Sequence, residues 1–297
     1  MIDKKYSDSP ITPGHRACAG CGLLIAARTV MESVGKDVIV ANATGCLEVT
    51  TTPYPNSAWN MPWIHSLFEN ASSVASGIQA ALNYKNKKKK IKVIAQGGDG
   101  ATFDIGFGQI SGMWDRKDDV VYVCYDNEAY CNTGVQSSGA TPWGANTTTT
   151  PKGSHPDSFG SEGSKKDMIS VALAHGLKYV AQSTVAYVDD IKKKIKKALE
   201  ISGPSYIQVL VPCVPGWKIE SNQVIKIAKL ANQTGLYPLL EYEDGELSNV
   251  VKSKDHKSVH EYLSLQGRFK HLIKDQKKID YIQSLANKNI DRYSLSF

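Results

Sequence analysis

The amino-acid sequence predicts an α/β fold: a doubly wound, mostly parallel sheet with helices on both faces, followed by a C-terminal extension. Short β-branched runs alternate along the chain with segments whose apolar residues recur at helical spacing. Residues 91–95 and 120–125 are almost entirely apolar, which is typical of strands buried on both faces of a sheet. The alternation of strands and helices then favours parallel strands joined by crossover helices.

The predicted elements follow one another in the order that such a fold requires. The first strand covers residues 37–41, and a helix follows in which apolar residues recur at Leu67, Ala71, Val74, Ala75, Ile78 and Leu82. The remaining elements are strand 91–95, helix 105–114, strand 120–125, helices 165–175 and 188–199, and strand 206–211. Short loops separate most of them, and the polar stretch 132–164 is long enough to indicate a functional loop or lid.

The chain is long enough to bury a full core. We expect one α/β domain over residues 1–217 and a C-terminal extension over residues 218–297. Apolar residues of the extension again recur in a helix-like pattern, at Val259, Tyr262, Leu263, Phe269, Leu272 and Ile273. This pattern fits packing on the same domain and packing on a partner subunit equally well.

Charge and hydropathy exclude several classes of partner. The formal net charge is +6, and lysines gather in residues 85–90 and 192–197. Such runs are typical of solvated faces, with docking of an acidic electron-transfer partner as the alternative. Nucleic acid is not expected, because aromatic residues do not interleave with the basic ones. No apolar run reaches the ~20 residues of a membrane span, and the N-terminus opens no signal peptide, so we expect a cytoplasmic protein.

Four of the six cysteines suggest a single metal site. Cys18 and Cys21 form a close CxxC pair, Cys46 follows, and Cys213 stands far downstream beside two prolines. In a chain of this size such a set is typical of a cytosolic metal or redox site. Four thiolates suit structural zinc as well as an iron–sulfur cluster, and the spacing alone leaves both open.

A second candidate site lies where two predicted strands end. Gly98-Asp99-Gly100 follows one buried strand, and Asn127 follows the next. Glycines let a phosphate approach the backbone, while Asp99, Asn127 and the Ala129 carbonyl offer the oxygen ligands that Mg²⁺ takes together with phosphate. Because doubly wound folds bind ligands at the carboxyl ends of their strands, the sequence predicts a magnesium and phosphate site at this edge.

These residues carry a resemblance to a known family. Gly98-Asp99-Gly100 with Asn127 resembles the motif that binds thiamine diphosphate through Mg²⁺. Six collinear blocks resemble the β subunit of pyruvate:ferredoxin oxidoreductase, in the 2-oxoacid:ferredoxin oxidoreductase family: TPGHRACAGCG (12–22), ATGCLEV (43–49), IHSLFENASSVASGIQAA (64–81), DIGFGQISGM (104–113), NEAYCNTGVQSSGATPWGA (127–145) and VPCVPGW (211–217).

The resemblance implies CoA-dependent oxidative decarboxylation of pyruvate to acetyl-CoA and CO₂, reversible, with electrons passed to ferredoxin. It implies thiamine diphosphate, Mg²⁺ and one 4Fe–4S cluster as cofactors. The implied cluster ligands are Cys18, Cys21, Cys46 and Cys213. The implied Mg²⁺ ligands are Asp99, Asn127 and the Ala129 carbonyl, and the further cofactor contacts are Gly45, Gly98 and Gly100. Asn132 and Thr133 are expected near the reacting carbon, and Val49 is our candidate for the apolar wedge between the two cofactor rings.

The resemblance also implies partner subunits. The glutamate that faces the cofactor's pyrimidine comes from a different domain in this family, on the α subunit of split enzymes, and the sequence contains neither a second thiamine-type domain nor a two-cluster ferredoxin cysteine run. We therefore expect activity only with α, γ and ferredoxin-like δ subunits. The alternatives are the same role for another 2-oxo acid, such as 2-oxoisovalerate or 2-oxoglutarate, and a non-catalytic metal-binding interaction module.

Overall fold

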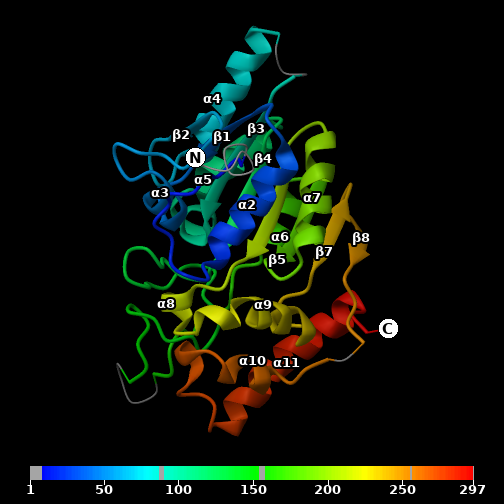
Figure 1. The fold of residues 1–297 in the computed structure, drawn as a ribbon. Helices are drawn as coiled ribbons and strands as arrows, with labels where there is room; N and C mark the ends of the chain where they lie inside the picture. Colours follow the sequence, from blue (N-terminus) through cyan, green and yellow to red (C-terminus); the bar gives the residue numbers. More distant parts are fainter. Residues whose placement is uncertain (1–8, 87–89, 154–157, 255, 297) are drawn as a thin grey trace.

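A computed structural model describes residues 9–86, 90–153, 158–254 and 256–296. Its centre is an eight-stranded sheet with the strand order β2-β1-β3-β4-β6-β5-β7-β8 (Figure 1). The first six strands pair in parallel, and β7 and β8 extend one edge in antiparallel fashion. The prediction of a doubly wound, mostly parallel sheet is confirmed.

The bounds of the elements are as follows. The strands are β1 (Val38–Asn42), β2 (Trp63–His65), β3 (Lys92–Gly98), β4 (Val121–Asp126), β5 (Tyr179–Thr184), β6 (Ser205–Leu210), β7 (Leu240–Glu243) and β8 (Glu246–Val250). The helices are α2 (Gly22–Val34), α3 (Cys46–Thr51), α4 (Ala71–Tyr84), the π-helix η1 (Gly100–Ile105), α5 (Phe107–Asp115), α6 (Met168–Ala174), α7 (Val188–Glu200), α8 (Val214–Trp217), the 3-10 helix η2 (Ser221–Gln223), α9 (Val224–Gln233), α10 (Val259–Ser264), the 3-10 helix η3 (Gly267–Phe269) and α11 (Gln276–Tyr293).

The sheet separates two apolar layers. Along β4, Val121, Val123 and Tyr125 point into the layer that holds α2 and α7, whereas Tyr122 and Cys124 point into the layer that holds α4, α5 and α6. Successive side chains of a strand point to opposite faces, so a strand covered on both sides is usually apolar along most of its length. This is why β4 was predictable from its sequence.

Other elements depart from the prediction. The predicted helix 105–114 begins two residues later, as α5, because residues 100–105 form the wider π-helix η1. The pattern from Val259 to Ile273 is not one helix: α10 ends at Ser264, and η3 begins at Gly267, where a β-carbon would lie 2.6 Å from the Lys218 side chain. β5 was missed because its sequence, YVAQST, is half polar although all six residues are buried.

The lysine run on α7 is not uniformly solvated. Lys194 is buried, and its ammonium group donates to the Gln182 carbonyl at 2.9 Å and contacts Asp190 at 2.7 Å. Of the run at 85–90, residues 87–89 lie outside the described part of the chain. Among the described residues no helix combines the length and apolarity needed to cross a membrane.

The C-terminal helices lie beyond the carboxyl ends of the parallel strands, below the sheet in Figure 1. Apolar residues of α10 and α11, including Leu263 and Ile282, belong to the same buried cluster as those of α2 and α7. This arrangement brings the last third of the chain next to the loops that follow β4 and β6. The division of the chain at residue 217 remains a prediction.

Candidate functional site

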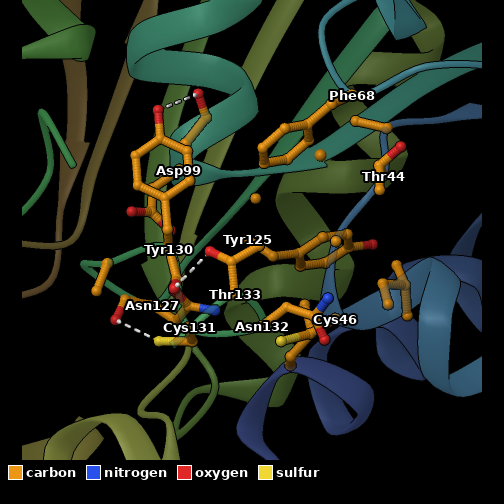
Figure 2. A pocket seen from close by; sticks show the side chains of 18 of the residues that line it. Thr44, Cys46, Phe68, Asp99, Tyr125, Asn127, Tyr130, Cys131, Asn132 and Thr133 are labelled. Carbon is orange, nitrogen blue, oxygen red and sulfur yellow. Dashed lines mark hydrogen bonds between the residues drawn. The ribbon is translucent and has the colours of Figure 1, made fainter. Parts of the chain in front are cut away.

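A cavity of about 100 Å³ opens at the carboxyl ends of β1, β3 and β4. Its lining comes mainly from the ends of these strands and the loops that follow them, with Leu23 of α2 and Phe68 added. It contains most of the predicted residues, as Figure 2 shows for those it labels. The predicted residues in the lining are Gly45, Cys46, Gly98, Asp99, Gly100, Asn127, Ala129, Asn132 and Thr133. Val49 is not among the lining residues, and its side chain is 46% exposed.

Asp99 is a buried carboxyl group at the end of β3, with 1% of its surface exposed. Burial, together with the nearby Asp126 carboxylate, holds the pKa of Asp99 well above its ordinary value. Ser138 donates a hydrogen bond of 2.5 Å to Oδ2, which leaves Oδ1 facing the loop after β4. A cation beside Asp99 would remove the electrostatic cost of burying this charge.

The Asn127 amide faces two oxygens at once. In the orientation that satisfies them, its nitrogen donates to Asp99 Oδ1 at 2.9 Å and to the Ala129 carbonyl at 2.6 Å. With the amide turned over, its oxygen stands 2.9 Å from Asp99 Oδ1 and 2.6 Å from the Ala129 carbonyl oxygen, close to the ~2.9 Å between neighbouring oxygens around an octahedral Mg²⁺ with bonds of ~2.0–2.1 Å. The predicted donor set therefore fits the predicted ion.

Gly98 and Gly100 have different surroundings. A β-carbon on Gly98 would meet only the Tyr125 carbonyl, at 3.9 Å, so this side of the strand end is open. A β-carbon on Gly100 would lie 2.3 Å from the Tyr130 ring. The absence of a side chain at Gly100 thus makes room for Tyr130, whose hydroxyl donates to Asp104 at 3.0 Å. Tyr130 lines the cavity and was not predicted.

A buried charge network behind the cavity was also not predicted. Lys165 contacts Asp126 at 2.5 Å and Glu128 at 2.8 Å, and Arg268 contacts the other oxygen of Glu128 at 2.6 Å. Burial alone would raise the pKa of Glu128, but the positive charges of Lys165 and Arg268 outweigh this effect and lower the pKa. Sequence offers no signal for these pairs, because Lys165 and Arg268 stand in segments without a motif.

Trp217 joins this network to the loop that carries Cys213. The Trp217 indole nitrogen donates to the Asn127 carbonyl at 2.7 Å. The Arg268 guanidinium lies 3.6 Å from the centre of the Trp217 ring, a cation–π contact. The loop after β4, the cysteine loop after β6 and the C-terminal segment therefore hold one another in place.

The four predicted thiols lie close enough to influence one another electrostatically. Cys18 is exposed, whereas Cys21, Cys46 and Cys213 are partly buried. Burial and the proximity of the other three thiols raise the pKa of Cys46 to about 12. Within the described ranges, however, no group of three or more His, Cys, Asp or Glu side chains is arranged to hold a metal ion.

Cys213 has the surroundings of a thiolate. A hydrogen bond from Cys131 lowers the pKa of Cys213 to about 7. Burial opposes this shift, whereas the Gly216 amide, 3.4 Å from the Cys213 sulfur, and the positive charge of Arg268 add to it. Cys131 lines the cavity as well, so it stands between the cavity and the cysteine loop. Sequence analysis predicted neither the Cys131–Cys213 hydrogen bond nor the electrostatic influence of Arg268 on Cys213.

Comparisons with known proteins identify relatives of this chain. The thiamine pyrophosphate enzyme C-terminal TPP-binding domain family matches residues 43–209. Pyruvate synthase subunit PorB of Methanosarcina barkeri is 49% identical over 99% of this chain and 100% of its own length. PorB of Methanocaldococcus jannaschii is 51% identical over 88% and 89%, and ketoisovalerate oxidoreductase subunit VorB of Pyrococcus furiosus is 42% identical over 88% and 86%.

A solved structure supports the fold. The 2-oxoglutarate:ferredoxin oxidoreductase of Magnetococcus marinus matches 77% of this chain and 81% of its own chain, with a TM-score of 0.58 and 23% identity. The relatives that match nearly the full chain confirm the resemblance drawn from the sequence blocks. The chain therefore belongs to the thiamine diphosphate-dependent 2-oxoacid:ferredoxin oxidoreductases, as a subunit of the PorB type.

Proposed function

We propose that the chain is the thiamine diphosphate- and iron–sulfur-binding β subunit of a pyruvate:ferredoxin oxidoreductase. It would act in the CoA-dependent conversion of pyruvate to acetyl-CoA and CO₂, and in the reverse reaction. The observation that carries this proposal is the convergence of Asp99, Asn127 and the Ala129 carbonyl on one point of the cavity. The PorB relatives, at 41–51% identity, support pyruvate as the substrate.

Different residues of this chain would bind the cofactor and the substrate. Asp99, Asn127 and Ala129 would hold Mg²⁺ and with it the cofactor's diphosphate, close to the open side of Gly98. When bound, thiamine diphosphate supplies the electron sink that decarboxylation of a 2-oxo acid needs. Asn132 and Thr133, in the same lining, would hydrogen-bond the substrate.

Cys18, Cys21, Cys46 and Cys213 would ligate one 4Fe–4S cluster beside this cavity. Support comes from the mutual electrostatic influence of their thiols and from the lowered pKa of Cys213. Thiolates are the ligands such clusters require. When bound, the cluster supplies a one-electron acceptor within the subunit, which zinc cannot do.

Partner subunits would complete the active site. Apolar side chains stand exposed on the elements that flank the cavity: Val49 (46%), Ile64 (45%), Leu67 (55%) and Ile105 (47%). Exposed apolar groups gathered around a cavity are typical of an interface. The α subunit would cover this face and contribute the pyrimidine-facing glutamate, and a ferredoxin-like δ subunit would carry electrons onward to ferredoxin, with γ completing the complex in the cytoplasm.

The test is anaerobic co-purification of the chain with its partner subunits, followed by an assay with coenzyme A, a viologen acceptor and a panel of 2-oxo acids. We expect pyruvate to give the highest kcat/KM, and the preparation to be brown with a broad absorption near 400 nm that dithionite bleaches. A colourless preparation that contains zinc would refute the cluster.

A second candidate is the same role with 2-oxoisovalerate. The VorB relatives, at 42% identity, are about as similar to this chain as the Pyrococcus PorB proteins. The substrate panel separates the two candidates, because a preference for the branched acid would replace pyruvate and leave the cofactor assignments unchanged.

A further inference from the structure

We propose that a second cavity, between α11 and residues 142–143 and 164–165, binds an amphipathic organic anion: a carboxylate or phosphate carried on an apolar body. This cavity has a volume of about 480 Å³ and shares no lining residue with the cofactor cavity. Cavities of ~300–1,000 Å³ are the usual size of small-molecule sites. The proposal is independent of the proposed function.

The walls of this second cavity are mostly apolar. Trp143, Leu263, Phe269 and Ile282 supply them from four different segments. Trp143 is itself held by ring contacts of 4.6 Å with both Phe159 and Tyr281, so its position is fixed before a ligand arrives. A rigid apolar wall of this kind favours a hydrophobic ligand body, since little ordering is needed on binding.

One end of the cavity is positively charged. Lys165 and Glu128 reach it, but they are engaged with each other and with Asp126 and Arg268, so that network of two carboxylates and two cations is balanced. The remaining ionised lining groups are then both cationic.

Those two groups stand on one face of α11. Lys288 and Arg292 are four residues apart, and Leu285 and Asn289 line the cavity between and beside them. The carboxylate nearest to Arg292 belongs to Asp167, at 3.8 Å, with both side chains about half exposed at 58% and 47%. Such a pair contributes little. For Lys288, no ion pair occurs within the described parts of the chain.

A smaller cavity of about 200 Å³ adjoins the second cavity at this charged end. The two share Lys165, Leu236, Tyr237, Asn289 and Arg292. The anionic group of the ligand would therefore lie at this junction, beside Arg292, with its apolar body against Trp143 and Phe269. A neutral ligand with the same body would gain only the hydrophobic part of the binding energy.

Octanoate and 1-octanol, which share an alkyl chain and differ in charge, test this proposal by isothermal titration calorimetry. The titrations use the full-length chain and the assembled complex. We expect octanoate to bind one site about tenfold more tightly than octanol, since two screened charges contribute about one power of ten. The double variant Lys288→Gln with Arg292→Gln should remove this preference and leave octanol binding unchanged.

Two further variants make the result specific. Leu285→Trp, which fills the cavity from α11, should weaken both ligands, whereas Lys196→Gln on the exposed face of α7 should change neither. Thiamine diphosphate with Mg²⁺ should not displace octanoate. Equal affinities for the two ligands, an unchanged octanoate preference in the double variant, or loss of the site in the assembled complex would each overturn the proposal. Circular dichroism checks that every variant is folded.

Discussion

The Asp99 carboxyl group is buried at the end of β3, and within the described residues it forms no ion pair. Its Oδ1 atom faces the Asn127 amide, which also faces the Ala129 carbonyl. Buried charge is costly unless a counter-charge compensates it. In the proposed function, a cation that brings an anionic ligand with it would supply this counter-charge.

Replacing Asp99 with asparagine tests that arrangement. Asp99→Asn keeps the shape of the side chain and removes its charge, so we expect at least about tenfold weaker binding of thiamine diphosphate in the presence of Mg²⁺, as one lost charge-assisted contact costs ~1.5–3 kcal/mol. Calorimetric titration measures the affinity. Asp115→Asn, at the exposed end of α5, is the matched control. Unchanged affinity in Asp99→Asn would remove this residue from the proposed Mg²⁺ ligands.

The Glu128–Arg268 pair predicts a large effect on stability. Arg268→Gln removes one of the two cations that compensate buried Glu128, and breaking a buried pair costs ~3–5 kcal/mol. Urea unfolding should show this loss in the free energy of unfolding. Arg116→Gln breaks an exposed pair with Asp118 at 3.0 Å, for which ~0–1 kcal/mol is expected. Equal losses in the two variants would contradict a compensating role for Arg268.

Asp99 and Asn127 could be predicted from the sequence, but the buried ion pairs of Glu128 with Lys165 and Arg268 could not. Both predicted residues follow apolar runs, and parallel strands bring their carboxyl ends to one edge. Lys165 and Arg268 lie 37 and 140 residues from Glu128 along the chain. Pairing over such separations depends on how loops and helices pack, which no local periodicity encodes.

At the level of elements, the C-terminal segment is attached to the long loop through His271. The His271 Nε2 atom lies 2.6 Å from the Phe159 carbonyl, to which it donates when the ring is neutral with its proton on Nε2. Burial, with the charges of Lys152 and Lys278, lowers the pKa of His271 below its ordinary value of 6.5. The folded chain therefore binds this proton less readily than the unfolded chain.

This difference predicts the direction of a pH effect. As the pH is lowered through 6.5, the unfolded state takes up the proton first, so the free energy of unfolding decreases. It levels off once the pH is below the pKa of His271 in the folded state. His271→Gln lacks this contribution and should show a shallower loss between pH 7 and 5, measured by urea unfolding. His260→Gln, at an exposed position of α10, should follow the wild-type profile. A wild-type slope in His271→Gln would exclude His271 as its source.

The elements that the sequence predicted are those whose periodicity the fold preserves. β3, β4 and β6 are mostly apolar on both faces, and α4 and α7 carry a regular apolar stripe. In β5, by contrast, buried polar side chains are satisfied by hydrogen bonds, for example from Gln182 to the Pro238 carbonyl at 2.7 Å. A polar strand of this kind cannot be recognised until its hydrogen-bond partners are known.

For the whole molecule, one apolar cluster extends from α2 to α11. A chain that ends at Trp217 would expose the surface that α9, α10 and α11 cover and would leave Glu128 without Arg268. We expect this truncated chain to aggregate or to lose cooperative unfolding, as judged by light scattering and circular dichroism. A cooperatively folded fragment of 1–217 would instead show that the predicted domain is independent.

The ion pair between Glu128 and Arg268 also bears on how the protein is made. Its two residues are 140 positions apart, and a ribosome that adds ~5–20 residues per second needs roughly 7 to 30 seconds to travel between them. Until Arg268 is made, the nascent loop after β4 lacks one of the cations that hold it, and until Trp217 is made, 90 residues after Asn127, it also lacks the ring that will meet its backbone. The loop after β4 therefore reaches its final arrangement only late in synthesis, after the C-terminal segment has been made.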